Sequence, residues 1–392
     1  MRILEVVVRY PPYVGGVENS VYHVATRLAR RGHEVRVVCA DEPAGAPLEV
    51  EGVSVVRLPW RFKLGNTNLA FGLWEALRRE KPDVIHTHIP TAFFADLAAS
   101  VAEAIDVPLV LTYHNDLVGE GVKGLLAGVY NRYRLPAVLE RCDRVVVTNP
   151  HYPRESPWLD PDDPKLICIP WGVEAERFRP PAQEPPPPPP LVIGFLSLLD
   201  VHHRYKGLDV LLEALALLPD TRLRVGGRGE DLEDYQRQAR EFGVEDRVEF
   251  LGFVPDAELN AFYGSCHVFV LPSTDARREG FGLVLLEAMA CGRPVVTTPI
   301  VGVAGDVEPR GVGLVVPTHE PVELAAAIQN LQDLPAMGRR ARELVEERYT
   351  WKRVTDDYEA LFRSLLPLPR HGGEGRGEGE WDQSSLTGSN SK

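Results

Sequence analysis

Residues 279–287 read Glu-Gly-Phe-Gly-Leu-Val-Leu-Leu-Glu, and this segment is the most informative part of the chain. It follows a strand-like apolar run that ends at Leu271, and its two glycines stand where a loop would turn into a helix. Gly280 and Gly282 allow the backbone to approach a ligand closely. The free amides at the start of the following helix would attract a phosphate. The segment therefore predicts a strand, an anion-binding loop and a helix, which is a unit of an α/β sheet.

Glu287 is the only charged residue between Gly280 and Gly292. On a helical wheel it falls between Leu283 and Ala290, on a face that we expect to be buried. Burying a carboxylate without a partner is costly, so Glu287 needs a hydrogen-bond donor. The vicinal hydroxyls of a ribose are one natural partner, and backbone amides are the structural alternative. A second carboxylate eight positions earlier, at 279, favours the ribose over backbone amides as the partner of Glu287.

Outward from this segment, short β-rich runs alternate with amphipathic helical stretches. In the first half, the predicted strands cover residues 3–8, 35–39, 53–58, 84–86, 109–113 and 144–148, and the helices cover 20–31, 69–80, 92–105 and 125–141. In the second half, the strands cover 191–196, 222–225, 248–251, 267–271 and 294–297, and the helices cover 207–218, 231–242, 256–264, 282–291, 322–331 and 351–366. This alternation predicts α/β domains with parallel sheets covered on both faces.

The 392 residues are too many for one typical core and suit two domains. Six consecutive prolines at 185–190 cannot join a helix or a central strand, and they favour an extended spacer. We therefore predict an N-terminal domain over 1–178, a proline-rich linker over 179–190, a C-terminal domain over 191–350 and a last helix over 351–366. Residues 367–392 are poor in apolar side chains and are predicted to be a disordered tail.

The composition excludes several classes of protein. The net charge of −13 argues against a nucleic-acid binder, since neutralising phosphates needs a basic face. The five cysteines are scattered and have neither a Cys-x-x-Cys nor a zinc spacing, which favours a reduced cytoplasmic setting. The N-terminal run lacks the features of a signal peptide, and the sequence has no uncharged apolar stretch long enough for a membrane span. We therefore expect a cytoplasmic protein.

Residues 279–287 and their flanks at 272–273 and 288–296 resemble the retaining glycosyltransferases of family 4. Further matching segments follow the family's order at 15–18, 83–88, 112–116, 169–174 and 206–209, so the resemblance covers nearly the whole chain. It implies the GT-B fold, in which two Rossmann-like domains face each other across a cleft and the C-terminal helix packs back on the N-terminal domain.

The same resemblance implies an activity. A hexose, expected to be mannose or glucose, would pass from a nucleotide diphosphate sugar to a hydroxyl group with retention of the anomeric configuration. The acceptor would be a glycan, a lipid-linked or a small molecule in cell-envelope polysaccharide or glycolipid synthesis. The protein would then work in the cytoplasm, with the inner face of the cell membrane as a further location.

The resemblance also implies roles for residues of the segment. The first carboxylate, Glu279, would lie at the donor sugar, and the second, Glu287, would hold the ribose. Backbone amides around Phe281, Gly282 and Leu283 would hold sugar hydroxyls and phosphate.

Three other positions match the family's donor site, and each also has a structural interpretation. Gly16 would lie beside the donor phosphates or the acceptor, although glycine pairs are common in turns. His114 follows the strand at 109–113 and would lie near the donor sugar, although most isolated histidines are structural. Gly226 belongs to a glycine turn that would flank the base or the diphosphate, and a purely structural turn is an equal alternative.

Lys206 can neutralise the charge that develops on a departing diphosphate, which is the electrostatic effect that usually dominates such catalysis. The family often carries Gly-Arg upstream of this lysine, where this chain has Ser197 and Leu198. Arg204 would then supply the second positive charge. The structural alternative is a solvated basic turn.

His86 and His88 alternate on one predicted strand and, together with Asp116, suggest a metal site. His-x-His also occurs on the buried face of many strands, and GT-B glycosyltransferases generally need no bound metal. We therefore expect a metal-independent enzyme without a bound cofactor.

The helical stretch at 125–141 has basic residues on or near it, namely Lys123, Arg132, Arg134, Arg141 and Arg144. In membrane-associated members of the family, basic amphipathic helices at this place touch lipid. Here Pro136 interrupts the helix and acidic residues dilute its charge, which favours an ordinary surface helix over weak peripheral membrane association.

Other functions remain as alternatives. A GT-B sugar-nucleotide epimerase would turn over the donor without an acceptor, and a phosphorylase would carry a lysine-bound cofactor. A non-catalytic sugar-nucleotide or glycan-binding module is disfavoured by the intact Glu279, Glu287, Lys206 and His114. A hydride-transferring oxidoreductase is disfavoured because no Gly-x-Gly-x-x-Gly follows the first strand.

Overall fold

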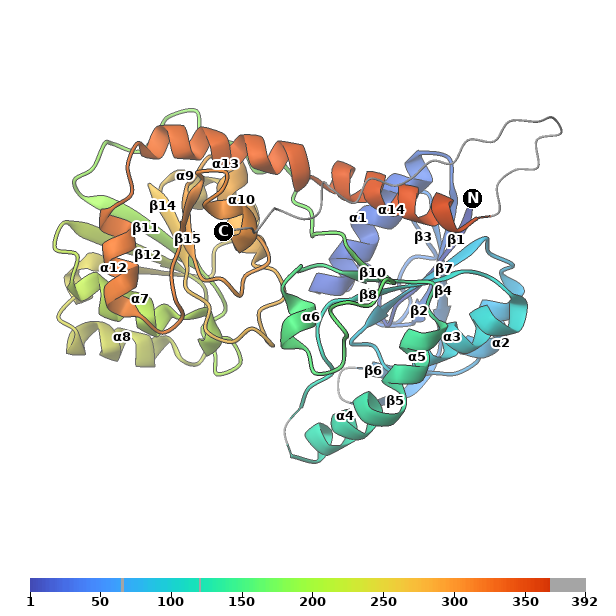
Figure 1. The fold of residues 1–392 in the computed structure, drawn as a ribbon. Coiled ribbons are helices and arrows are strands. Elements are labelled where there is room, and N and C mark those ends of the chain that lie inside the picture. Colours follow the sequence, from blue (N-terminus) through green and yellow to red (C-terminus); the bar gives the residue numbers. More distant parts are fainter. Residues whose placement is uncertain (65–66, 120, 367–392) are drawn as a thin grey trace.

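The computed structural model describes residues 1–64, 67–119 and 121–366, which form two α/β domains (Figure 1). The tail that the sequence predicts over 367–392 lies outside the described residues. Within the described ranges, no helix has both the length and the apolar character needed to cross a membrane.

The N-terminal domain is built on an eight-stranded sheet in the order β10-β9-β8-β7-β1-β2-β4-β3. Its parallel strands are β1 (Arg2–Val6), β2 (Glu34–Ala40), β4 (Val53–Leu58), β7 (Val84–Ile89), β8 (Leu109–Tyr113), β9 (Arg144–Val147) and β10 (Leu166–Cys168). The short strand β3 (Glu49–Val50) pairs antiparallel at the edge. β1 lies between β2 and β7, so the strand order reverses beside it. Ligands of open α/β sheets bind beyond the carboxyl ends of the strands at such a reversal.

The helices of this domain are α1 (Gly16–Arg30), α2 (Leu73–Arg79), α3 (Phe94–Ile105), α4 (Gly121–Tyr133), α5 (Leu135–Arg141) and α6 (Tyr152–Glu155). The strands β5 (Trp60–Leu64) and β6 (Thr67–Ala70) form a separate antiparallel pair. α1 buries its apolar stripe, including Val21, Val24 and Leu28, against the sheet core. The helix predicted over 125–141 is divided into α4 and α5, and Pro136 stands in the first turn of α5, where its missing amide costs no hydrogen bond.

The C-terminal domain has a six-stranded, fully parallel sheet in the order β13-β12-β11-β14-β15-β16. The strands are β11 (Leu191–Leu196), β12 (Thr221–Gly226), β13 (Val248–Gly252), β14 (Val268–Leu271), β15 (Val295–Thr297) and β16 (Gly313–Val315), and the helices are α7 (Leu208–Ala216), α8 (Leu232–Glu241), α9 (Leu259–Gly264), α10 (Leu283–Ala290), α11 (Ala304–Val307) and α12 (Pro321–Gln329). The order reverses between β11 and β14. The segment at 279–287 follows β14 and therefore lies at the predicted ligand-binding edge.

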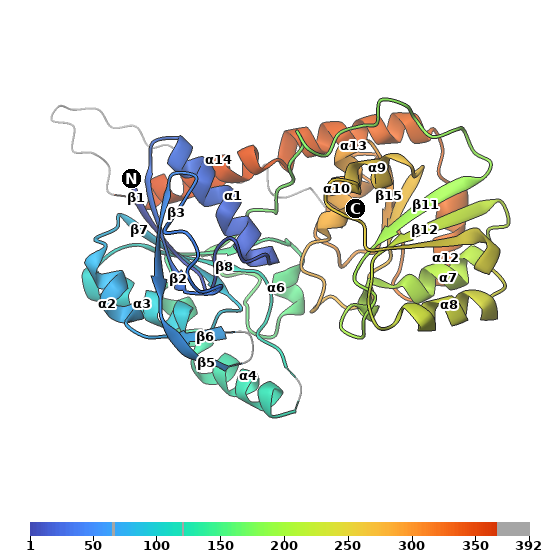
Figure 2. The same ribbon diagram turned by 180° about the vertical axis from the view of Figure 1, so that it is seen from behind.

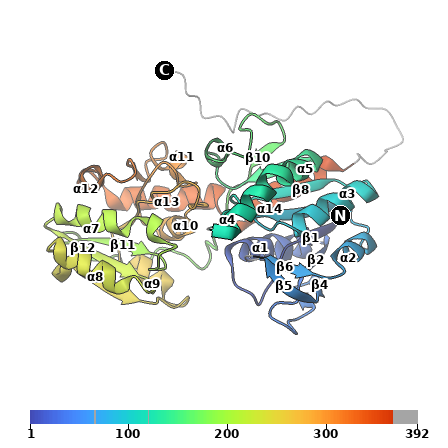
Figure 3. The same ribbon diagram turned by 90° about the horizontal axis from the view of Figure 1, so that it is seen from below.

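Two further helices connect the domains, as Figures 2 and 3 show from behind and from below. α13 (Leu334–Arg348) packs against α10 of the C-terminal domain, and α14 (Trp351–Leu365) packs against α1 of the N-terminal domain. The Trp351 ring stacks on His23, with the ring centroids 4.6 Å apart. The expectation that the last helix returns to the N-terminal domain is therefore confirmed.

The proline-rich segment lies against the C-terminal domain instead of forming a free spacer. The Glu184 carboxylate accepts a hydrogen bond from Arg293 at 2.6 Å. The carbonyl oxygen of Pro186 lies 2.6 Å from Nε2 of His267. Proline prevents regular pairing here, but carbonyl oxygens and side chains still bind to the neighbouring domain.

Candidate active site

A half-buried lysine and a buried glutamate form an ion pair at the carboxyl edge of the C-terminal sheet. Lys206 ends the 3₁₀ turn η1 (Arg204–Lys206), which lies between β11 and α7. Its ammonium lies 3.0 Å and 2.8 Å from the two carboxylate oxygens of Glu279. Ser273, after β14, donates a further hydrogen bond of 2.5 Å to Oε2 of Glu279. The glutamate is 1% exposed, so its charge depends on these two donors.

The lysine of the pair is charged. Burial opposes the Lys206 ammonium, but the Glu279 carboxylate outweighs burial and raises the pKa of the lysine. A substrate that entered beside the pair would meet a cation fixed by a salt bridge and stacked over the Tyr205 ring at 5.0 Å. The pair thus places a positive charge at the edge where an anionic ligand would bind.

The loop between the two glutamates has the backbone freedom that its glycines predict. Gly282 adopts a φ of 84° just before α10, and a Cβ there would lie 2.6 Å from Val301. A Cβ on Gly280 would meet nothing within 4 Å, so this side of the loop is open. Phe281 is buried against Gly302, and Leu283 begins the helix. The amides that begin α10 therefore follow an open loop, as the phosphate-binding prediction requires.

Glu287 has a partner that the sequence did not indicate. The hydroxyl of Tyr263 in α9 donates to Oε2 of Glu287 at 2.5 Å. Burial raises the pKa of this carboxyl to about 7, although the Tyr263 bond acts in the opposite direction. Glu287 is thus half-buried instead of fully buried, and its hydrogen-bond donor is a tyrosine hydroxyl instead of a backbone amide. Tyr263 escaped sequence analysis because no motif spacing links it to residue 287.

A cleft of about 750 Å³ lies beside η1 and the loop after β14. The lining residues come from both domains and are Glu155, Arg204, Tyr205, Asp209, Thr274, Asp275, Ala276, Arg277, Arg278 and His319. Arg204 reaches this cleft, but Asp231 and Asp234 bind its guanidinium at 2.7 Å and 2.9 Å. Arg204 thus faces two carboxylates, whereas Lys206 faces only that of Glu279, which makes Arg204 the weaker candidate for stabilising a leaving diphosphate. Arg277 and Arg278 are cations of the same cleft that the sequence analysis overlooked.

Gly226 ends β12 and is packed tightly. A Cβ there would lie 2.6 Å from the Leu196 side chain and 2.9 Å from Val254. The next residue, Gly227, has a φ of 136° and passes close to the carbonyl of Ser197. Packing alone therefore explains a glycine at 226, which favours the structural interpretation of this turn.

On the N-terminal side, two predicted positions meet through one tryptophan. Gly16 begins α1, and a Cβ there would lie 3.1 Å from Trp171. The Trp171 ring meets the His114 ring edge-on at 5.5 Å. His114 follows the carboxyl end of β8 and is 6% exposed. Trp171, which lies in one of the segments matching the family, thus brings Gly16 and His114 together.

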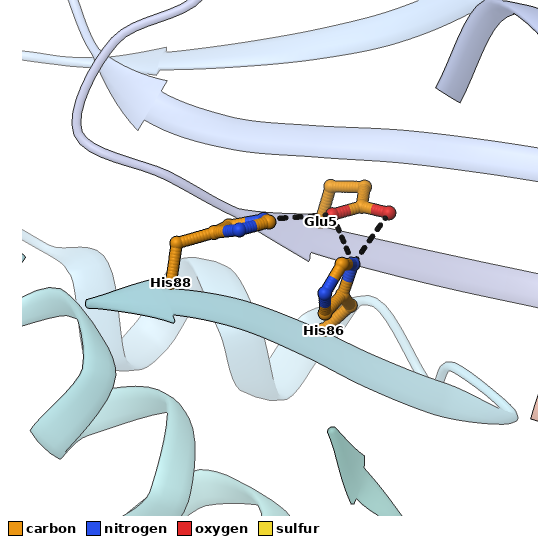
Figure 4. A group of neighbouring side chains, drawn as sticks. All are labelled: Glu5, His86 and His88. Carbon is orange, nitrogen blue, oxygen red and sulfur yellow. Dashed lines mark hydrogen bonds and ion pairs between the residues drawn. The ribbon is translucent and has the colours of Figure 1, made fainter. Parts of the chain in front are cut away.

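His86 and His88 face Glu5 in the sheet interior instead of Asp116 (Figure 4). β1 and β7 are neighbours in a register that pairs Glu5 with His86. One oxygen, one His86 nitrogen and one His88 nitrogen lie within 4.8 Å of one another, a spacing that could hold a metal ion. Asp116 instead accepts hydrogen bonds from Tyr113 and from Ser156, so it does not join the two histidines in the metal grouping that the sequence analysis considered and disfavoured.

Comparisons with known proteins agree with this arrangement of domains. Residues 183–348 match the family model described as glycosyl transferases group 1, and residues 14–177 match the model described as glycosyltransferase family 4. The chain is 30% identical to the glycogen synthase of Mycobacterium tuberculosis, covering 90% of this chain and 92% of that protein. It is 28% identical to the O-antigen chain mannosyltransferase C of Escherichia coli, covering 93% of this chain and 99% of that protein.

Among solved structures, the chain resembles the sucrose-phosphate synthase from Thermosynechococcus elongatus. The TM-score is 0.67 at 25% sequence identity, and the alignment covers 93% of this chain and 98% of that one. Both domains are thus shared with a glycosyltransferase of GT-B fold, which confirms the fold class that the sequence predicted.

Proposed function

The chain belongs to glycosyltransferase family 4, and we propose that it moves a hexose from a nucleotide diphosphate sugar to a hydroxyl group with retention of configuration. The observation that carries the proposal is the Lys206–Glu279 ion pair, which lies at the edge of the sheet where ligands of such folds bind. Mannose and glucose are the sugars we propose, because the relatives include a mannosyltransferase and a glycogen synthase.

Each part of the site has a role in this reaction. The acceptor oxygen forms a bond to the anomeric carbon on the face from which the diphosphate leaves, the carbon–oxygen bond to the diphosphate breaks, and the proton of the acceptor hydroxyl passes to the departing diphosphate. Lys206 and the amides that begin α10 stabilise the charge on the departing diphosphate. Glu287 accepts hydrogen bonds from the ribose, and Glu279 lies at the sugar. Because Lys206 and the amides of α10 supply the positive charge, we propose that the reaction needs neither a bound metal nor a cofactor.

The transfer assay with variants tests this assignment. We expect Lys206→Ala and Glu279→Ala to lose most transfer activity, whereas Arg240→Ala, an exposed cation on α8, keeps it. Full activity in both of the first two variants would show that the site lies elsewhere. An epimerase would instead convert the donor without any acceptor, so the same assay without acceptor separates the two reactions.

The donor can be identified by thermal shift, because a ligand of the native state raises its melting temperature. Among UDP-, GDP- and ADP-sugars, those of one base should clearly raise the melting temperature, and Lys206→Ala should reduce this rise. Repeating the transfer assay with a chelator tests the proposal of metal independence, which predicts unchanged activity.

The surface of α4 supports a lipid-linked acceptor. Five apolar side chains of this helix are exposed, namely Val122, Leu125, Leu126, Val129 and Tyr133. An ordinary surface helix would bury such residues, but α4 buries only Ala127 and Asn131. The basic residues Lys123 and Arg132 are exposed on the same helix. Exposed apolar residues with basic neighbours are typical of helices that lie in a membrane interface.

We therefore propose that α4 binds weakly to an anionic membrane that holds the acceptor. Flotation with vesicles containing anionic lipid should carry the protein upward, and Leu125→Asp/Val129→Asp should abolish this. Equal recovery of the native and the substituted protein with the vesicles would contradict the role of α4.

A further inference from the structure

A tyrosine of α9 holds one oxygen of the second glutamate in the segment 279–287. Tyr263 is fully buried, and its hydroxyl donates to Oε2 of Glu287 at 2.5 Å, across the contact between α9 and α10. The other oxygen, Oε1, accepts no hydrogen bond from any residue that the structure describes, and it is not closed off from solvent. Glu287 therefore has one oxygen fixed from inside the domain and one that a ligand can reach.

The Tyr263 hydroxyl is itself held in place by packing. Its ring meets the rings of Phe178, Phe262 and Phe269, with centroids 6.0, 5.5 and 5.4 Å away. Burial and the Glu287 carboxylate raise the pKa of Tyr263 well above its usual value, so the hydroxyl keeps its proton and remains a donor. A donor on a locked ring fixes the orientation of the carboxylate that accepts from it.

The same hydrogen bond favours the ionised form of the glutamate. Burial raises the pKa of Glu287 to about 7, and the bond from Tyr263 acts in the opposite direction. The other charged or titratable groups that face this carboxyl are Arg177, Glu174, Asp256 and Cys291. Arg177 favours the ionised form, whereas the carboxylates of Glu174 and Asp256 oppose it. A substitution that removes only the tyrosine hydroxyl leaves all of these groups in place.

We propose that Tyr263 is a positioning residue for the donor, which orients the Glu287 carboxylate so that Oε1 accepts hydrogen bonds from the ribose hydroxyls of the nucleotide. This inference rests on the proposed function, which assigns the ribose to Glu287. Hydrogen bonds to an ionised acceptor are stronger than those between neutral groups. A carboxylate that is already oriented also loses less conformational freedom when the nucleotide binds.

The variant Tyr263→Phe tests the proposal, because it keeps the packed ring and removes only the hydroxyl. Calorimetric titration uses UDP, GDP or ADP, whichever raises the melting temperature most. We expect Kd to rise about tenfold, the factor that roughly corresponds to one hydrogen bond. The 2′,3′-dideoxy form of the same nucleotide lacks the hydroxyls and should bind both proteins equally. An unchanged Kd, or an equal loss with both nucleotides, would overturn the proposal.

Two further variants separate positioning from a general disturbance of the site. In a Glu287→Ala background, Tyr263→Phe should have little further effect on Kd, because its action passes through Glu287. A further tenfold loss in that background would show that Tyr263 acts by another route. Tyr22→Phe removes a hydrogen bond of the same kind, from Tyr22 to Glu51 at 2.7 Å in the N-terminal domain, and should bind the nucleotide as the wild type does.

The pH dependence of binding gives a readout that packing alone would not move. The affinity of the wild type should rise as the pH passes through about 7, because the ionised carboxylate is the better acceptor. In Tyr263→Phe the midpoint should lie at a higher pH, because the bond that lowers the pKa of Glu287 is lost. A midpoint that stays in place or moves to lower pH would contradict the proposal.

The ionisation of Glu287 can also be followed without a nucleotide. Carbon NMR of the full chain with ¹³C-labelled glutamate carboxyl groups, with Glu287→Gln as the assignment control, measures the same midpoint in the wild type and in Tyr263→Phe. If the native protein bound no nucleotide, the proposed function would fail. The NMR titration would still show whether Tyr263 controls the ionisation of Glu287, and an equal midpoint in both proteins would overturn that part of the inference.

Discussion

Replacing Glu287 by glutamine should make the protein more stable at neutral pH and less able to bind a nucleotide. The carboxylate accepts one hydrogen bond of 2.5 Å from Tyr263. The carbonyl oxygen of a glutamine can accept the same bond, so the substitution removes the charge and keeps the contact. What changes is the free energy needed to ionise a half-buried carboxyl group.

The magnitude follows from the pKa of Glu287, which burial raises from 4.5 to about 7 in the folded protein. Between these values the folded state binds more protons than the unfolded state, so the free energy of unfolding falls as the pH rises. Below pH 4.5 both states are protonated and the penalty is absent, and above pH 7 it is fully present. The difference of about 2.5 pH units corresponds to about 3 kcal/mol.

Urea denaturation of the wild type and of Glu287→Gln at several pH values measures this directly. The two proteins should have the same free energy of unfolding at pH 4.5. The variant should then become more stable than the wild type as the pH rises to 7, and the difference should stay constant above pH 7. Glu233→Gln, at an exposed position of α8, is the control and should follow the wild type at every pH. A stability difference that does not change with pH would refute the reasoning.

Binding should change in the opposite direction. Ribose hydroxyls donate to the ionised carboxylate, so a nucleotide should raise the melting temperature of the wild type more than that of Glu287→Gln. An unchanged nucleotide shift in the variant would remove Glu287 from the donor site. Both changes together would be an exchange of stability for function at a binding site.

Three further substitutions have expected outcomes. Lys206→Met leaves the Glu279 carboxylate, which is 1% exposed, without its cation and should lower the free energy of unfolding in urea by about 3–5 kcal/mol. The double variant Lys206→Met/Glu279→Gln should restore most of that stability without restoring transfer. Restored transfer would contradict the catalytic assignment. Arg204→Gln should lower kcat less than Lys206→Met, because two aspartates already compensate its charge; the reverse ranking would make Arg204 the principal cation. Trp351→Ala should destabilise the protein by about 3–5 kcal/mol, because a ring that is 2% exposed is lost from the contact between α14 and α1; a loss below about 1 kcal/mol would mean that this contact adds little.

Local pattern was enough for most strands of both sheets, although the strands β3, β10 and β16 were not predicted. The runs at 53–58, 109–113 and 191–196 are strands with the predicted bounds. A buried parallel strand needs a nearly continuous apolar run, as at 109–113 and 191–196, whereas 53–58 includes the polar residues Ser54 and Arg57 and is only partly buried. The helix α13 was not predicted. Its buried face includes the small residues Gly338 and Ala341, which give a weak apolar signal, and it packs so closely that a Cβ on Gly338 would lie 2.1 Å from the Gly292 carbonyl oxygen.

The sequence by itself determined the two α/β halves, the loop with its two glutamates and the cation at Lys206, because each of these depends on residues that are neighbours along the chain. Only the tertiary structure decided which side chains pair. Lys206 meets Glu279 across 73 residues, and Tyr263 meets Glu287 from another helix. Glu5 faces His86 because β1 and β7 are adjacent in register, although 81 residues separate the two. The physical reason is that strand order and register bring such residues together, and no periodicity along the chain records that choice.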